Sequence, residues 1–253
     1  MLDRITVDEY LTDADIAGLG FKTGKLSDTA VALIGFQRTK TISPRSRKSY
    51  MAGDPAPLLD EVSERRDAIL TGALREAACE HQPVKAYLKD IGLRPKSMID
   101  IGCGQAIPDL FFQRDYKPRF TLVDIEQTDE LYHNWAGQGS GYASLDCAKT
   151  LLHDNGAAKS KVTAINPRKE PEALDGLSAD MLISFYSCGF HYPVDDYADL
   201  MVRTVADGGV VCLDLRKRYL RRRPEPLARV LEAGTMTELF EDARSFRVAL
   251  RAG

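Results

Sequence analysis

Residues 97–106, SMIDIGCGQA, decide the fold of this chain. The apolar start of the stretch predicts a buried strand, and its Gly-x-Gly element followed by Ala106 predicts a tight turn into a helix. Because glycine has no Cβ, the backbone of such a turn can approach a ligand closely. The free N–H groups of the following helix start point to the same place. The stretch therefore predicts a ligand site at the carboxyl end of the strand.

A second apolar strand, Phe120–Val123, ends directly before Asp124. This acid lies about 20 residues beyond the glycines, where dinucleotide-type folds use a carboxylate to accept hydrogen bonds from a ribose. A Gly-x-Gly element alone is a weak signal, but the strand and the acid after it strengthen the prediction of a nucleoside site.

Short apolar strands alternate with helical segments from about residue 83 onward. The predicted strands are residues 98–101, 120–123, 162–165, 181–185, 210–215, 236–240 and 246–250. The predicted helices are residues 84–91, 108–112, 145–153, 197–205 and 227–232. This alternation predicts an α/β fold with a mostly parallel, Rossmann-like seven-stranded sheet covered on both faces. The last two strands have no helix between them, so they are expected to form an antiparallel pair.

The first part of the chain has a different pattern. Residues 8–16 and 54–80 carry apolar residues at helical spacing, whereas residues 35–50 are basic and rich in turn formers. We expect a mobile loop over 35–50, either as a solvated surface segment or as a lid that touches an anionic substrate. The expected organisation is a helical N-terminal extension or lid over residues 1–82 and a catalytic domain over 83–253.

Composition narrows the function classes. A net charge of −3 does not indicate a polyanion partner for the whole chain. The five cysteines are dispersed, with no spacing typical of zinc sites, and an odd, scattered set fits a reducing compartment. We see no signal peptide, no membrane span and no acid/histidine cluster for a metal. The expected location is the cytoplasm.

Together, the five β-α units, the glycine turn, the acid after the second strand and the closing strand pair resemble the class I S-adenosylmethionine-dependent methyltransferases. The resemblance covers about residues 83–253, and residues 207–211, DGGVV, look like the family's glycine turn into its fifth strand. Ala106 stands where many members have glycine. The rival is a nicotinamide or flavin Rossmann domain, whose Gly-x-Gly-x-x-Gly fingerprint would need glycine at Ile107.

The resemblance implies S-adenosyl-L-methionine as cofactor. The two glycines would let the backbone meet its methionine part, an acid in the first strand would orient the loop, and the acid after the second strand would hold the ribose. Further positions would contact the adenine or, through strand-four carbonyls, the methionine ammonium. The implied cofactor-binding residues are Asp100, Gly102, Cys103, Gly104, Gln105, Asp124, Ile125, Asn166, Ser184 and Phe185. His133 and Trp135 would either cap the adenine pocket or pack within a surface loop.

Acceptor specificity is expected in residues 184–193, SFYSCGFHYP, at the end of the fourth strand. The segment lacks the Asn/Asp-Pro-Pro-aromatic pattern of enzymes that methylate amino groups. We therefore expect O-methylation of a hydroxyl on a small-molecule or sugar/glycan-type acceptor. His191 is the candidate general base, or else a structural residue, and Tyr186, Phe190 and Tyr192 are candidate pocket residues.

The run of residues 216–223, RKRYLRRR, places six positive charges in eight residues of an acidic chain. It is either a solvated face or a contact for a phosphate-bearing acceptor, with Arg216 as the candidate substrate contact. Two alternatives to a small acceptor stay open: methylation of RNA or another polyanion, and a non-catalytic cofactor-binding interaction module. The oligomeric state is not predicted.

Overall fold

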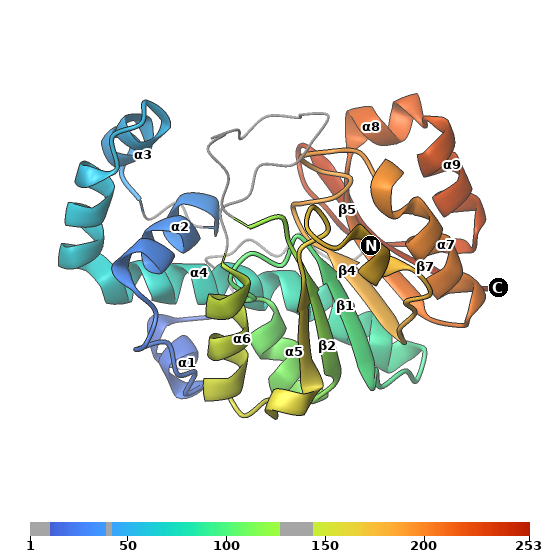
Figure 1. The fold of residues 1–253 in the computed structure, drawn as a ribbon, viewed down its shortest axis with the longest axis horizontal. Helices are drawn as coiled ribbons and strands as arrows, with labels where there is room; N and C mark the ends of the chain where they lie inside the picture. Colours follow the sequence, from blue (N-terminus) through green and yellow to red (C-terminus); the bar gives the residue numbers. More distant parts are fainter. Residues whose placement is uncertain (1–10, 39–41, 127–143) are drawn as a thin grey trace.

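The computed structural model describes residues 11–38, 42–126 and 144–253, and its centre is a seven-stranded sheet (Figure 1). The strand order is β3-β2-β1-β4-β5-β7-β6. The strands are β1 (Ser97–Ile101), β2 (Arg119–Val123), β3 (Val162–Ile165), β4 (Met181–Ser184), β5 (Val210–Arg216), β6 (Thr235–Glu241) and β7 (Ser245–Arg251). The first five are parallel, and β7 runs antiparallel to both β5 and β6. The predicted fold is confirmed, including the antiparallel C-terminal pair.

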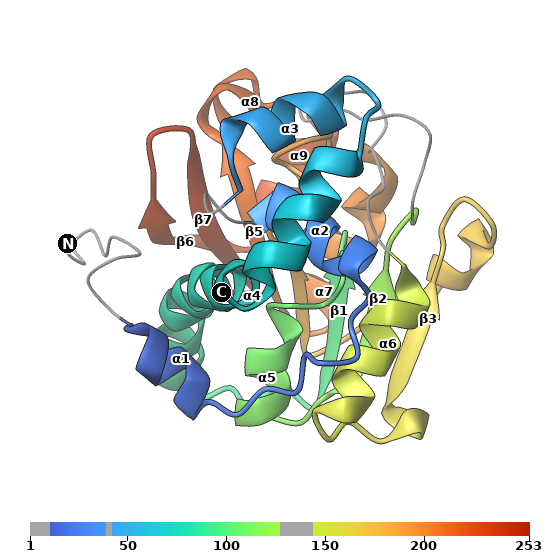
Figure 2. The ribbon, with the colours of Figure 1, turned by 90° about the vertical axis from the view of Figure 1, so that its left-hand side faces the viewer.

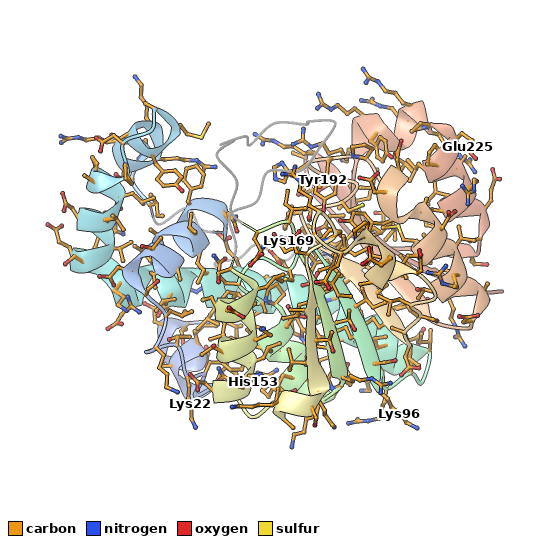
Figure 3. All side chains as sticks on the ribbon, in the orientation of Figure 1. Lys22, Lys96, His153, Lys169, Tyr192 and Glu225 are labelled. Carbon is orange, nitrogen blue, oxygen red and sulfur yellow. The ribbon has the colours of Figure 1, made fainter. Side chains whose placement is uncertain are left out.

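All carboxyl ends of the parallel strands lie at one edge of the sheet. Figure 3 shows this direction: Lys96, directly before β1, lies at the lower side, whereas Lys169 and Tyr192, after β3 and β4, lie at the upper side. The glycine turn after β1 and the acid after β2 therefore meet, since β1 and β2 pair in parallel with Ile101 opposite Val123.

Helices cover both faces of the sheet, with α4 (Ala56–Asp90), α5 (Asp109–Asp115) and α6 (Leu145–Asp154) on one side of the strands and α7 (Ala198–Ala206) and α9 (Glu225–Glu232) on the other (Figure 1). Figure 2 is seen from the side of α4, α5 and α6. One face packs against α4, α5 and α6 in a single apolar core. The other face packs against α7 and α9 in a second core. Such coverage explains why β1, β4 and β5 are buried along nearly their whole length. None of the helices in the described part of the chain is long and apolar enough to cross a membrane.

The prediction of a mobile loop over residues 35–50 is wrong. Its first residues end α2 (Asp28–Arg38), and most of the rest form α3 (Pro44–Met51). α2 is an apolar helix that buries Val31, Ile34 and Phe36, and the sequence prediction missed it. Ser43 caps α3 by accepting the Ser46 N–H, and Pro44 is the first residue of the helix. Serine and proline are common at helix starts as well as in loops, which explains why the sequence analysis predicted a loop here. Lys40, part of the same basic stretch, lies outside the described residues.

The bounds of two other predicted helical regions differ from those in the structure. Most of residues 54–91 belong to α4, which is kinked at Arg65, continues through Pro83 and ends before Gly92, a residue with φ of +68°. Because the buried face of α4 belongs to the same core as the sheet, the N-terminal helices and the sheet share one hydrophobic interior across residues 82–83. At the N-terminus, α1 spans Asp13–Gly18, while residues 8–10 of the predicted first helix lie outside the described residues.

The basic run forms a helix that the sequence analysis did not predict. It is the short α8 (Lys217–Arg222), which follows β5 without a loop. α8 and α3 stand on opposite sides of the carboxyl edge of the sheet (Figure 1).

Candidate functional site

The glycine turn after β1 contains three residues with left-handed backbone. Gly102, Gly104 and Ala106 have φ values of +74°, +57° and +59°. The Gly102 N–H donates to the Val123 carbonyl at 2.7 Å, which ties the turn to β2. A Cβ on Gly102 would lie 1.7 Å from the Ser187 Oγ, so this position has no room for a side chain.

Asp124 follows β2 and is buried beside the turn. Its Oδ2 accepts the Gly104 N–H at 3.0 Å, and its Oδ1 accepts the Glu126 N–H at 2.9 Å. Burial raises the pKa of Asp124, and these backbone donors oppose that effect only in part. Because each carboxylate oxygen has two lone pairs, the Asp124 side chain can still accept hydrogen bonds from a further pair of donors.

Asn166, just after β3, holds two loops together. Its side-chain amide donates to the Ile125 carbonyl at 3.3 Å and to the Glu126 Oε2 at 3.0 Å. Glu126 also pairs with Lys169 at 2.9 Å, and these contacts lower its pKa. The predicted adenine contact Asn166 is thus placed between the β2 and β3 ends, where it orients the backbone next to Asp124.

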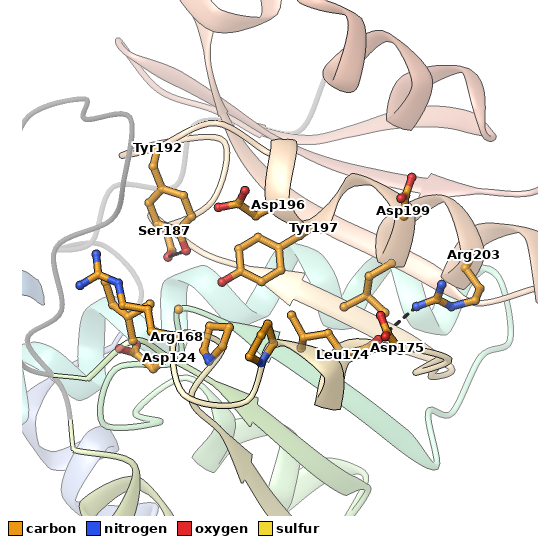
Figure 4. A pocket seen from close by; sticks show the side chains of 15 residues that line it. Asp124, Arg168, Leu174, Asp175, Ser187, Tyr192, Asp196, Tyr197, Asp199 and Arg203 are labelled. Carbon is orange, nitrogen blue, oxygen red and sulfur yellow. Dashed lines mark hydrogen bonds between the residues drawn. The ribbon is translucent and has the colours of Figure 1, made fainter.

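A cavity of about 530 Å³ opens at this edge of the sheet (Figure 4). Four predicted site residues line it: Gly102, Asp124, Ile125 and Tyr192. The sequence analysis missed the others, which are Pro167, Arg168, Pro171, Leu174, Asp175, Ser187, Asp196, Tyr197, Asp199, Leu200 and Arg203. Most of these lie in the connections after β3 and β4, and their position after predicted strands was the signal that could have found them.

The connection after β4 supplies a hydroxyl pair to the cavity wall. The Ser187 Oγ and the Tyr192 hydroxyl are 2.9 Å apart, and burial raises the pKa of Tyr192 well above its usual value. Ser184 fixes the start of this connection, because its hydroxyl donates to the Ile101 carbonyl at 2.8 Å and accepts the Cys188 N–H at 2.9 Å. The predicted cofactor residue Ser184 therefore links the β1 and β4 ends.

A buried ion pair lies beneath the same connection. Asp214 in β5 and Arg247 in β7 form a bidentate pair with distances of 2.8 and 2.6 Å, and their side chains are 3% and 2% exposed. Arg247 also donates to the Glu80 carbonyl of α4 at 2.6 Å and lies 4.0 Å from the centre of the Phe185 ring. Although burial opposes the charge, Asp214 raises the pKa of Arg247 above its usual value.

This ion pair positions Tyr186. Asp214 accepts the Tyr186 N–H at 3.0 Å, and the Tyr186 backbone is held at φ of +48°, which is unfavourable for a residue with a bulky side chain. Burial raises the pKa of the Tyr186 hydroxyl. The predicted pocket residue thus owes its orientation to charges on two distant strands.

The remaining predicted acceptor residues form a stacked group. The Phe190 ring makes edge contacts with Tyr186 at 5.0 Å and His191 at 4.9 Å, and the Arg216 guanidinium lies over it at 4.7 Å. None of these four is among the described residues that line the cavity.

Three further predicted residues are buried around the glycine turn: Asp100 in β1, and Cys103 and Gln105 in the turn itself. Burial raises the pKa of Cys103 well above that of a free thiol, which suits a packing role. His133 and Trp135 lie outside the described residues.

No protein-family model matches the chain, and no curated protein matches it in sequence. The structure has the glycine turn after β1, the acid after β2 and the closing antiparallel pair on which the family resemblance rested. It adds the parallel strand order β3-β2-β1-β4-β5 and the hydrogen bond between the glycine turn and Asp124. The chain has the fold of the class I S-adenosylmethionine-dependent methyltransferases.

Several solved structures, two of them named as methyltransferases, are similar to it. The 16S rRNA methyltransferase RsmC of T. thermophilus, in complex with AdoMet and guanosine, is 16% identical with a TM-score of 0.47, over 70% of this chain and 43% of RsmC. The N-methyltransferase NodS of Bradyrhizobium japonicum, in complex with S-adenosyl-L-homocysteine, is 14% identical with a TM-score of 0.46, over 70% of this chain and 87% of NodS. Monomeric WbdD is 15% identical with a TM-score of 0.46, over 69% of this chain. The match spans only 40% of the WbdD chain.

Proposed function

We propose that this protein is an S-adenosylmethionine-dependent methyltransferase. The proposal rests on the Asp124 carboxylate, which accepts the Gly104 N–H and lines the cavity at the carboxyl edge of the sheet. In open α/β sheets, ligands bind beyond the carboxyl ends of the strands. The fold adds support, although fold does not by itself decide function.

The residues present fit this cofactor. Asp124 retains lone pairs for two ribose hydroxyls, and Ile125 beside it offers an apolar surface to an adenine. Gly104 leaves open space beside the turn, so a methionine group can approach its backbone, whereas Ser187 packs against Gly102. When bound, S-adenosylmethionine would supply a methyl group on a positively charged sulfur.

The protein's own contribution to methyl transfer is alignment of the acceptor and removal of its proton. The hydroxyls of Tyr192, Ser187 and Tyr197 and the Asp196 carboxylate surround the cavity, and such a polar lining suits a hydroxylated acceptor. We therefore propose O-methylation of a small-molecule or sugar/glycan-type hydroxyl. His191 remains our candidate base; its ring packs on Phe190 outside the described cavity lining, so it would act from the loop after β4.

A second candidate function is methylation of RNA or another polyanion. The observation that favours it is the position of α3 and α8 on the two sides of the carboxyl edge, with exposed basic residues on both: Arg45, Arg47, Lys48, Arg221 and Arg222. Binding of a polyanion would weaken steeply with salt, because each phosphate contact releases counterions. Turnover of a neutral acceptor that does not change with salt would exclude this candidate.

The proposal is tested by calorimetric titration of S-adenosylmethionine and S-adenosylhomocysteine into the purified protein. We expect micromolar binding by the wild type and a loss of at least about tenfold in Asp124→Ala, since two hydrogen bonds to a charged acceptor are removed. Asp175→Ala is the matched control, because Asp175 lines the same cavity on the connection after β3 and is exposed.

Absence of binding by the wild type would overturn the proposal, and so would equal weakening by both variants. Where Asp124→Ala alone weakens binding, transfer of a labelled methyl group to hydroxylated sugars is the next measurement.

A further inference from the structure

Arg216 is the last residue of β5 and is held at the carboxyl edge of the sheet. Its backbone N–H donates to the Gly189 carbonyl at 3.1 Å, and its guanidinium lies 4.7 Å from the centre of the Phe190 ring. Stacking on an aromatic face leaves the in-plane N–H donors of a guanidinium available at its edges. The side chain is therefore oriented by the loop after β4, in the group of predicted acceptor residues that Phe190 forms with Tyr186 and His191.

The Arg216 side chain has no carboxylate partner in the described part of the chain. It is half-buried, and its Nε is fully buried without a hydrogen bond to any described residue. Burial lowers the pKa of Arg216, and the positive charges of Arg218 and Arg244 lower it further. Arg218 and Arg244 thus lie within electrostatic range of Arg216.

The acids nearest in sequence to this group already have other partners. Glu241 pairs with Lys217, and Glu232 pairs with Arg223 at 3.0 Å. Asp242 accepts the backbone N–H groups of Arg244 and Ser245 at 2.6 and 2.7 Å, which closes the β6–β7 turn. None of these carboxylates pairs with the Arg216 guanidinium, which is therefore the group available to an external anion.

We propose that Arg216, with Arg218 and Arg244 beside it, binds a phosphate group carried by the methyl acceptor. A phosphate dianion offers oxygens for bidentate contact with the guanidinium edge, and its negative charge is attracted by the positive charges of Arg216 and Arg244. The role of this phosphate in the acceptor rests on the proposed methyltransferase function; the anion site itself does not. The acceptor class becomes a phosphate-bearing hydroxyl compound.

The test uses inorganic phosphate and methyl phosphate as probes, titrated at constant ionic strength against sodium chloride. Binding is followed by NMR through the Arg216 Nε–H resonance, assigned by its loss in Arg216→Gln, and through the backbone amides of residues 186–192. We expect saturable shifts in the wild type and at least about tenfold weaker binding of both probes in Arg216→Gln, because the stacked donor is lost. Arg221→Gln, an exposed change on α8, should leave binding within about twofold.

Arg244→Gln is a second variant that guards against misfolding of the first. Arg244 is exposed on the β6–β7 turn, so its removal should leave the fold intact and weaken phosphate binding by about threefold through lost electrostatic attraction. Equal phosphate binding in the wild type, Arg216→Gln and Arg244→Gln would overturn the proposal. Equal shifts with chloride alone would also overturn it, since the site would then hold an adventitious ion only.

Methyl phosphate distinguishes a site for free phosphate from a site for a phosphate group that an acceptor molecule carries. Binding of methyl phosphate within severalfold of inorganic phosphate is expected, because one oxygen must carry the acceptor; rejection of methyl phosphate would overturn the acceptor assignment. S-adenosylhomocysteine binding is measured on the same samples. A protein that binds phosphate but not S-adenosylhomocysteine contradicts the proposed function alone, whereas the reverse result contradicts the anion site alone.

Discussion

Two regions of the carboxyl edge are built in different ways. The glycine side comprises residues 102–106 and Asp124, and the arginine side comprises the loop 185–192 with Asp214, Arg216 and Arg247. On the glycine side, the central hydrogen bond joins Gly104 and Asp124, which are 20 positions apart. On the arginine side, Arg247 reaches 33 positions back to Asp214 and 167 positions back to Glu80.

The difference shows two ways of positioning a functional loop. Backbone geometry shapes the glycine side, where missing side chains allow left-handed turns. A buried charge pair shapes the arginine side, where Asp214 and Arg247 hold Tyr186 in a backbone conformation that it would not adopt alone. The first device depends on local sterics, and the second depends on strands brought together by folding.

The largest effect on the free energy of unfolding is expected when the Asp214–Arg247 ion pair of the arginine side is broken. Arg247→Met leaves Asp214 as an unpaired buried charge, so the free energy of unfolding should fall by about 3–5 kcal/mol in urea denaturation. Adding Asp214→Asn removes that charge and should recover at least about 1 kcal/mol. A loss below about 1 kcal/mol in Arg247→Met would mean that the pair does not stabilise this region.

The next effect concerns the glycine side and uses a matched pair. Gly102→Ala and Gly104→Ala both place a Cβ on a left-handed residue, which costs about 1–2 kcal/mol in each case. Only the Gly102 variant also meets Ser187, since a Cβ on Gly104 finds its nearest neighbour, Gln37 Oε1, at 3.6 Å. Gly102→Ala should therefore lower the free energy of unfolding by about 1–3 kcal/mol more than Gly104→Ala. Equal losses would show that the Ser187 contact yields without cost.

A pH dependence is expected in the helices that support the glycine side. His81 of α4 is buried against Phe112 of α5, and burial lowers the pKa of His81 to about 3 despite Asp115 nearby. Below about pH 6.5 the His81 side chain is protonated in the unfolded chain but stays neutral in the native protein. The free energy of unfolding is therefore highest above pH 6.5 and decreases as the pH falls below this value.

Urea denaturation at pH 7 and pH 5.5 measures this loss. Each pH unit in the window costs up to about 1.4 kcal/mol, and His81→Leu, which cannot titrate, should show a loss smaller by about 1 kcal/mol over this interval. An unchanged difference between the two pH values in His81→Leu would assign the acid sensitivity to other groups.

The smallest expected effect is at Ala106. Its buried methyl group stands on a left-handed residue, where the family resemblance led us to expect glycine in many members. In Ala106→Gly, relief of about 1 kcal/mol of backbone strain opposes the loss of about 0.8 kcal/mol for one buried methyl. The free energy of unfolding should change by less than about 1 kcal/mol. A larger loss would show that the methyl contact, and not the turn geometry, decides this position.

Sequence patterns predicted the strands well because each buried strand is a short apolar run next to a turn. β3 was predicted with its observed bounds, and Gly102, Asp124 and Ile125 all line the cavity at the carboxyl ends of the strands. The predictions failed where composition and structure disagree. α3 is polar and basic because only one side of it is covered, and α8 consists largely of exposed cations, so neither shows the apolar periodicity by which helices are recognised.

The sequence by itself determined the sheet, the left-handed glycine turn and the acid beside it, because strand burial, missing Cβ atoms and the residue after a strand are local properties. Only the tertiary structure decided that Asp214 pairs with Arg247 beneath Tyr186, and that Arg216 stacks on Phe190 apart from the cavity. Those contacts join residues from separate strands and loops. Their partners depend on which chain segments the folded sheet places side by side, and no local pattern records that choice.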